Sequence, residues 1–333
     1  MPAVPPRVLV RSITEAFAAS DSVAVAVSQE SGNPRRFVVR AERNHFEVWI
    51  YIWSLTHGGG PARPEDEYRI QLTGVSSPLQ KNPTGGPTLL MGFESNTQCF
   101  AGFDVERHRT FSTNSPSIQI RLTRIYEALQ NGLSFARKDN GEVAIGVRPD
   151  HFLAYVLNAP VLHKQGANAD VSRLLSQAVE LEKIDIEELK GLSQERQRIV
   201  STVSRLSRDA KFRRKVLNAY EQRCSVTRIQ LGLIDAAHIL PVGIDGSTDD
   251  VSNGISLSPT YHRAYDKGLI YLDESLVMKT NVERLSDLDV LGLTGGIDDF
   301  SAYLDTRIHL PQDRHQWPDS QMIQEANRAR GIF

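Results

Sequence analysis

The sequence predicts an α+β protein with two folded domains joined by a charged helical stretch, and three observations support this prediction. Residues 1–163 contain aromatic and β-branched runs of strand length, with helical segments between them. Residues 164–211 are charged, poor in aromatic residues and have the apolar spacing of helices. Residues 212–333 open with two short apolar runs and a helical segment, followed by a C-terminal extension of helices and loops. We therefore expect folded domains at 1–163 and 212–333 and a helical linker at 164–211.

The composition is typical of a folded protein in a reducing compartment. The chain has 333 residues, enough for two domains, and its 38 Lys and Arg residues nearly balance 40 Asp and Glu residues. Because the net charge is only −2, any contact with nucleic acid must come from local basic patches. The two cysteines, Cys99 and Cys224, form no CxxC pair, which excludes a disulfide scaffold and a cysteine-rich zinc ribbon. The sequence has no run of about 18 apolar residues, so we expect a cytoplasmic protein without a membrane span.

The elements of the first domain follow from local patterns. Residues 46–53 are aromatic and β-branched, as in a buried strand, and residues 68–73 alternate apolar and polar like a half-exposed strand. Apolar residues between Ile118 and Leu129 are spaced by four, three and four, which predicts a helix over 118–129. Further strands are expected at 88–93, 98–105 and 142–147, and a helix is expected at 149–157.

The linker changes charge along its length. An acidic cluster lies within residues 180–188, whereas eight basic residues and a single acid, Asp209, lie between Arg196 and Val216. Two interpretations remain open: a solvated helical face, or an arm that contacts phosphates.

His238, Asn253 and His262 follow one another within 25 residues, and this pattern is the clearest indication of catalytic chemistry in the sequence. Residues 233–240 form a short apolar strand that Pro241 ends, and residues 255–257 alternate like a second strand. Pro259 then begins a helix. The pattern therefore predicts a strand–loop–strand–helix unit around one small site.

The residue types in this unit suit hydrolysis of a phosphodiester. An imidazole titrates near neutral pH, so His238 can act as the base that activates water. His262 and Asp266 are four residues apart on one helix face and offer nitrogen and oxygen ligands for a divalent ion. The Asn253 amide transfers no proton at neutral pH, but it can hold a backbone segment and orient His238.

The segment resembles the HNH endonuclease family, whose active site is a ββα-metal fold. The resemblance covers about residues 212–273, in which Arg-Cys-x-Val-Thr leads to Ala-Ala-His-Ile-x-Pro, Asn-Gly-Ile-x-Leu and His-x-x-x-Asp-x-Gly-Leu-Ile. It implies His238 as the general base, Asn253 as the structural asparagine and His262 as a metal ligand. It places Asp266 where relatives have a second helix ligand, and it implies Mg²⁺ or Mn²⁺ as cofactor.

Two positions depart from the family pattern. Many members carry a metal ligand immediately before the catalytic histidine, where this chain has Ala237. Because strand side chains alternate, Asp235 shares the parity of Ala237 and is expected to reach the ion instead. Many members also hold a structural zinc with two CxxC pairs, whereas this chain has Cys224 alone, so we predict no structural zinc.

Four basic residues are candidates for DNA contact. Arg263 and Lys267 flank the expected ligands on the helix, and Arg213 and Arg214 lie in the basic stretch. The alternative for each is a solvated helix face.

The first domain is large enough to choose the target of a small nuclease unit. Its aromatic residues either fill the core or line a pocket for a flipped base. The set comprises Trp49, Tyr51, Trp53, Tyr68, Phe93, Phe100 and Phe103.

The expected function is therefore a metal-dependent endonuclease that cuts double-stranded DNA in a restriction or defence system. Residues 1–163 would select the target DNA, and modified (methylated) DNA is one candidate target. A homodimer is expected if both strands are cut. Two alternatives remain: a nuclease effector gated by a small ligand or partner, and a DNA-binding protein with an inactive HNH copy.

Overall fold

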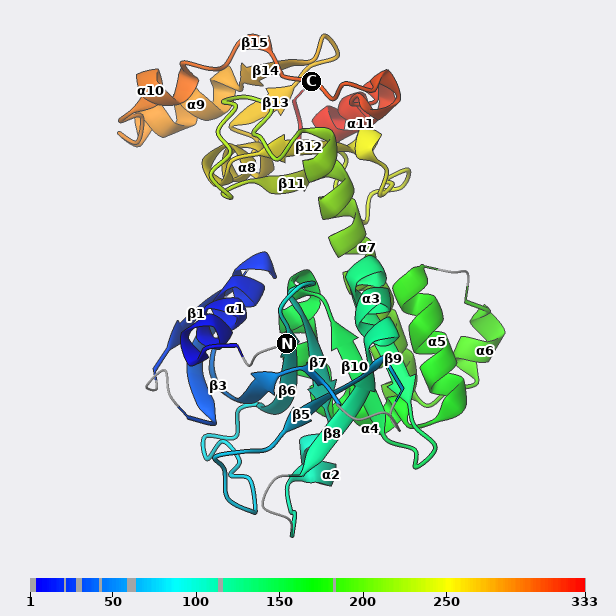
Figure 1. Ribbon diagram of the computed structural model, residues 1–333. Coiled ribbons are helices and arrows are strands. Elements are labelled where there is room, and N and C mark those ends of the chain that lie inside the picture. The colour runs from blue at the N-terminus through cyan, green and yellow to red at the C-terminus, as the bar shows by residue number, and fades with distance from the viewer. Residues whose placement is uncertain are drawn as a thin grey trace. The chain divides into compact units, whose positions relative to one another are not determined.

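The computed structural model describes residues 4–20, 22–27, 32–41, 44–58, 64–112, 116–181 and 184–332. The chain divides into two compact units, unit 1 at residues 1–207 and unit 2 at 208–333 (Figure 1). Strands and helices alternate along both units, so the predicted α+β class is confirmed. The division falls within helix α7 (Gln194–Ala219), which carries the chain from one unit into the other.

Unit 1 is built on a seven-stranded mixed sheet with the order β1-β2-β3-β6-β7-β10-β9. Strands β3 and β6 run parallel, and the other neighbours are antiparallel. The predicted strands at 46–53, 88–93, 98–105 and 142–147 lie in this sheet. Its members are β1 (Ser22–Ala26), β2 (Arg35–Ala41), β3 (Asn44–Ser54), β6 (Thr88–Glu94), β7 (Cys99–Phe103), β9 (Leu133–Arg137) and β10 (Val143–Val147).

The two faces of the large sheet are covered by different layers. Helices cover one face, and a three-stranded sheet with the order β4-β5-β8 and helix α3 cover the other. Strand alternation divides the core accordingly, since Phe100 packs on the helical side and Ala101 on the opposite side. The covering elements are α1 (Pro6–Ala19), α4 (Phe152–Gly166), α5 (Ala169–Glu180), β4 (Thr56–His57), β5 (Glu67–Gln71), β8 (Ser117–Arg121) and α3 (Leu122–Asn131). Short elements complete the unit: α2 (Val105–His108), η1 (Pro149–His151) and α6 (Ile186–Lys190).

The single helix predicted over 118–129 is wrong in its first half. Residues Ser117–Arg121 form strand β8, and helix α3 begins only at Leu122. Ile118 and Ile120 are two residues apart, so both side chains point to the same face of β8, and both are buried. Ile118 pairs with Ile70 of β5, which shows that a period of two, supported by a partner strand, overrides the helical spacing.

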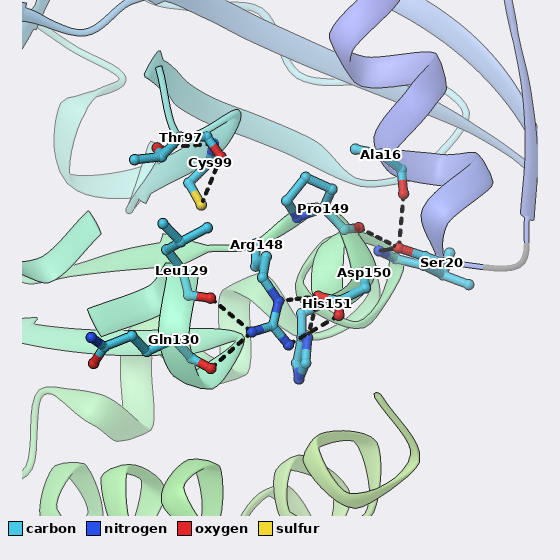
Figure 2. A network of polar contacts seen from close by, with 11 residues as sticks. Ala16, Ser20, Thr97, Cys99, Leu129, Gln130, Arg148, Pro149, Asp150 and His151 are labelled. Atoms are coloured by element: carbon cyan, nitrogen blue, oxygen red, sulfur yellow. Dashed lines mark hydrogen bonds and ion pairs between the residues drawn. The ribbon is translucent and has the colours of Figure 1, made fainter. Parts of the chain in front are cut away.

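A buried arginine connects the end of α3 to η1 (Figure 2). Arg148 donates from Nη1 to the carbonyl oxygens of Leu129 and Gln130, both at 2.9 Å, which helix α3 leaves unpaired at its C-terminus. Its Nε and Nη2 pair with Asp150 at 2.7 and 3.0 Å. Burial would raise the pKa of Asp150, but hydrogen bonds from His151 and Arg148 hold it well below its usual range. The network stabilises the turn that leads into α4.

The segment expected to link the domains is helical. Helix α5 buries Val171, Leu174 and Leu175 in the core of unit 1, and the first half of α7 adds Val200 and Val203. The apolar face of this helical segment is therefore packed in the core of unit 1 rather than solvated.

Unit 2 contains the predicted strand–loop–strand–helix motif. Strands β11 (Asp235–His238) and β12 (Gly254–Leu257) pair antiparallel, and α8 (Pro259–Asp266) follows directly. Cys224 is buried in the core of this unit, where the backbone N–H of Thr227 donates to its sulfur. The remaining elements are η2 (Val251–Asn253), β13 (Ile270–Leu272), β14 (Val277–Thr280), α9 (Val282–Val290), α10 (Ile297–Ser301), β15 (Thr306–Arg307), η3 (Arg314–Gln316) and α11 (Ser320–Ala329).

Within the described ranges, no helix has the length and hydrophobicity needed to cross a membrane.

Candidate active site

His238 is the last residue of β11, at the point where the chain leaves the hairpin for the loop that Pro241 begins. Its ring stacks on the ring of Phe212 from α7, with centroids 3.7 Å apart and planes within 9°. Its Nε2 lies 3.2 Å from Oδ1 of Asp249, at the far end of the loop. The side chain is 18% exposed, so water can reach it.

Asn253 is fully buried and holds both ends of this loop. Its Oδ1 accepts from the backbone N–H of Leu240 at 2.8 Å, and its Nδ2 donates to the carbonyl of Leu240 at 3.1 Å and of Thr248 at 2.9 Å. The backbone carbonyl of Asn253 also accepts from Ile239 at 2.9 Å. The Asn253 amide therefore holds together the two ends of the loop that follows His238.

The three predicted metal ligands meet around the imidazole of His262. Oδ2 of Asp235 lies 3.2 Å from its Nδ1, and Oδ2 of Asp266 lies 3.5 Å from its Nε2. The two carboxylates thus face opposite ring nitrogens, and in the described part of the chain no three His, Cys, Asp or Glu side chains converge as a ready-made metal site. Asp235 was expected near the ion because it shares the strand parity of Ala237. In the structure it lies beside His262, which is 27 residues later in the sequence.

Electrostatics strengthens the contact between Asp235 and His262. The hydrogen bond that His262 donates to Asp235 raises the pKa of His262 above its usual value, while burial works in the opposite direction. The same hydrogen bond lowers the pKa of Asp235, aided by the charge of Arg213, whose Nη1 lies 3.9 Å from Oδ1.

The Asp235–His262 pair fits a divalent cation. Carboxylate oxygen and imidazole nitrogen are both ligands for such ions. Two ligands that each lie about 2.1 Å from one ion at a right angle are about 3 Å apart, which agrees with the observed spacing. Asp235 and His262 can therefore share one ion at Nδ1, whereas Asp266 in this arrangement would reach an ion only at Nε2.

The candidate DNA-contact residues differ in their surroundings. Arg263, Lys267 and Arg214 are exposed. Arg213 is partly buried, and its guanidinium turns inward to Asp235 and to the carbonyl of Ile234.

Two residues at the site were not singled out from the sequence, Phe212 and Asp249. Both contact His238, and neither lies in its strand. Asp249 lies in the loop between the two strands together with Asp245 and Asp250, and no sequence signal indicates which of these carboxylates meets the ring.

The aromatic residues of unit 1 mostly fill the core. Phe93, Phe100 and Phe103 are each at most 1% exposed. Trp53 is only partly buried, and it lines a cavity of about 430 Å³ together with polar residues that include Gln71 and Thr73. Its indole N–H donates to the carbonyl of Thr73 at 3.2 Å.

Unit 2 contains a ββα arrangement: a hairpin with a histidine at the end of its first strand, a buried asparagine that holds the loop, and a helix histidine that faces a strand carboxylate. Residues 224–273 match the family model described as HNH endonuclease, so this part of the chain is an HNH endonuclease domain. The resemblance inferred from the motifs is thereby confirmed.

Residues 46–156, within unit 1, match a second family model, described as methylase-associated X1. A solved structure described as a modification dependent TagI restriction endonuclease is 12% identical, and the alignment covers 85% of this chain and 80% of that chain with a TM-score of 0.26. A TM-score of that size does not establish a shared fold. No curated protein matches the chain.

Proposed function

We propose that the protein is a metal-dependent endonuclease that hydrolyses phosphodiester bonds of double-stranded DNA, and that unit 1 selects the target in a restriction system. The observation that carries this proposal is the arrangement of His238, Asn253, Asp235 and His262 within a segment that matches the HNH endonuclease family. The methylase association in the description of the unit 1 family supports a system that distinguishes methylated from unmethylated DNA.

Each site residue has a distinct task in this reaction. His238 takes a proton from the attacking water, because it is the imidazole that combines access to solvent with a fixed orientation. Asn253 keeps the loop that follows His238 in place by bonding to Leu240 and Thr248. Asp235 and His262 would hold the divalent ion, Mg²⁺ or Mn²⁺, which supplies positive charge for the phosphate and the leaving oxygen when bound.

Exposed cations near the site are proposed to hold the DNA backbone. Arg263 lies on α8 beside His262, Lys267 directly follows α8, and Arg214 lies on α7. Because a single site cuts one strand, we also propose that the protein acts as a homodimer when it cuts both.

Target selection is assigned to unit 1, and the cavity beside Trp53 is the proposed place for a modified base. Bases stack on aromatic rings, and polar groups beside the ring can read the base edge. Gln71 and Thr73 supply such groups.

The test is cleavage of matched unmodified and cytosine-modified plasmids with Mg²⁺ or Mn²⁺. Discrete fragments from modified DNA, lost in His238→Ala, would support the whole proposal, and Trp53→Ala should then lose the discrimination but retain cleavage. Equal cutting of both plasmids would contradict only the dependence on modification and would leave the nuclease mechanism standing. Absence of cleavage with any divalent ion, or cleavage that survives His238→Ala, would contradict the nuclease mechanism and favour a DNA-binding role or gating by a separate ligand.

A further inference from the structure

The ring of His238 is held on two sides by residues outside its own strand. Phe212 covers one face at 3.7 Å with nearly parallel planes, and Asp249 meets the ring edge at Nε2, 3.2 Å away. Phe212 is 3% exposed, whereas the Asp249 side chain is 39% exposed. One contact is therefore a packed wall, and the other is a partly solvated carboxylate.

The aspartate contact determines which nitrogen of His238 can act as a base. A carboxylate only accepts hydrogen bonds, so a neutral His238 must donate to Asp249 from Nε2–H. The lone pair then lies on Nδ1. Over the described ranges Nδ1 has no hydrogen-bond partner, and it is not among the fully buried unpartnered atoms. Nδ1 is thus the nitrogen that remains free to take a proton from water.

The approach of Phe212 depends on a glycine. Gly254 pairs directly with His238 across the β11–β12 hairpin. A Cβ at this position would lie 2.3 Å from Val216 Cγ2 and 3.1 Å from the Phe212 ring, both on α7. Because residue 254 has no side chain, helix α7 comes close enough to the hairpin for Phe212 to stack on His238.

We propose that Asp249 and Phe212 are positioning residues for His238, a role that rests on the proposed function of this histidine as general base. Asp249 holds the Nε2–H tautomer and stabilises the imidazolium that forms, in the way that an orienting carboxylate supports a catalytic histidine. Phe212 fixes the plane of the ring, so that Nδ1 keeps one direction.

The proton and bond changes balance in this arrangement. Nδ1 of His238 takes one proton from water as the water oxygen forms a bond to phosphorus. The bond between phosphorus and the leaving oxygen breaks, and that oxygen takes a proton from solvent. The imidazolium then returns its proton to solvent.

The tautomer of His238 gives a test that does not require cleavage. Proton–nitrogen NMR of the full-length protein labelled at histidine, with His238→Ala to assign the signal, reports which ring nitrogen carries the hydrogen. We expect the Nε2–H form in the wild type and a mixture of both forms in Asp249→Ala. Phe212→Leu should shift the ring-proton signals of His238, and Phe212→Tyr should retain the wild-type shifts.

Cleavage kinetics test the consequence for the reaction. Asp249→Ala should lower kcat by at least about tenfold and at most about 10⁴-fold, the loss found when the buried aspartate that orients a catalytic histidine is replaced, with the Kd for DNA unchanged. Asp249→Asn retains an acceptor without the charge and should recover part of the rate. Asp245→Ala removes an exposed carboxylate of the same loop and should match the wild type.

The two measurements separate failure of this proposal from failure of the proposed function. An unchanged tautomer in Asp249→Ala, or a loss of cleavage that arises only from weaker DNA binding, would overturn the positioning role. A wild type that cuts no DNA would overturn the nuclease function, and the NMR result would still decide whether Asp249 holds the ring.

Discussion

The side chain of Asn253 bonds to both backbone groups of Leu240, accepting from its N–H at 2.8 Å and donating to its C=O at 3.1 Å. A buried amide thus pairs with Leu240 as a neighbouring strand would, two residues after the proposed catalytic histidine. The loop from Pro241 to Asp250 is closed at this point by one side chain, because the same Nδ2 also donates to Thr248.

Replacing Asn253 should therefore affect both stability and cleavage. Asn253→Ala leaves the N–H and C=O of Leu240 without their side-chain partner in a buried place, and each such group costs about 1–3 kcal/mol. We expect a free energy of unfolding lower by about 2 kcal/mol or more, measured by urea denaturation, and a loss of cleavage. Ser256→Ala is the matched control, since in the described structure its buried hydroxyl has no hydrogen-bond partner. Equal stability of the two variants would contradict the role of Asn253.

Gly254→Ala should destabilise unit 2. The new methyl group would overlap Val216 of α7, and overpacking of a core typically costs about 1–3 kcal/mol. Thermal unfolding would measure the effect, with Gly295→Ala as control because a Cβ there meets no atom within 4 Å. If Gly254→Ala is as stable as the wild type, close packing between α7 and the hairpin is not required.

Loss of the ligand pair should weaken metal binding selectively. Asp235→Ala and His262→Ala should each lower the affinity for Mn²⁺ at least about tenfold, measured by titration calorimetry. Asp266→Ala should have the smaller effect, because its carboxylate faces the other ring nitrogen of His262. A larger loss in Asp266→Ala than in Asp235→Ala would place the ion on the Nε2 side instead. Chelation of divalent ions should abolish cleavage.

Acid should destabilise unit 1 through Glu142. Burial would raise the pKa of this carboxyl, but a hydrogen bond from His108 and the charge of Lys138 lower it from 4.5 to about 2. A lowered pKa stabilises the fold fully above pH 4.5, and this contribution disappears as the pH falls towards 2. Its size is about 3 kcal/mol for such a shift.

Urea denaturation of wild type and Glu142→Gln at pH 7 and pH 3 would measure this contribution. We expect a large difference at pH 7 that narrows at pH 3. The exposed carboxyl of Glu65 provides the control Glu65→Gln, which should follow the wild type at both pH values. A difference between wild type and Glu142→Gln that does not depend on pH would show that the carboxylate is not ionised in the fold.

DNA affinity should depend on two exposed cations, Arg263 on α8 and Lys267 directly after it. Arg263→Ala and Lys267→Ala should each reduce the slope of log Kd against log salt concentration by about 1, the value for one phosphate contact. Arg213→Ala should change this slope less, because its guanidinium is turned to Asp235 and Ile234. Fluorescence anisotropy over a range of salt concentrations would compare the three. A slope unaffected by either the Arg263 or the Lys267 variant would exclude these two residues from the DNA contact.

The local part of the site could be predicted from the sequence. The first strand was predicted over 233–240 and is observed over Asp235–His238, so it ends two residues before Leu240, the residue that precedes Pro241. Asn253-Gly254 leads into the second strand, and Pro259 begins the helix on which His262 and Asp266 are four residues apart. These features depend on backbone preferences and on helical or strand periodicity within a few residues, so each is visible in a short stretch of sequence. The family motif was specific for the same reason.

Contacts between distant segments were decided only by the tertiary structure. Asp235 meets His262 across 27 residues, and Phe212 reaches His238 because α7 packs against the hairpin at Gly254. Residues 117–121 became a strand because β5 was available as a partner, although their spacing also fitted a helix. The sequence by itself predicted His238, Asn253, His262, Asp266 and Asp235 as candidate site residues and the elements on which they lie. The tertiary structure decided which nitrogen each carboxylate faces, because that depends on how the packed elements bring side chains together.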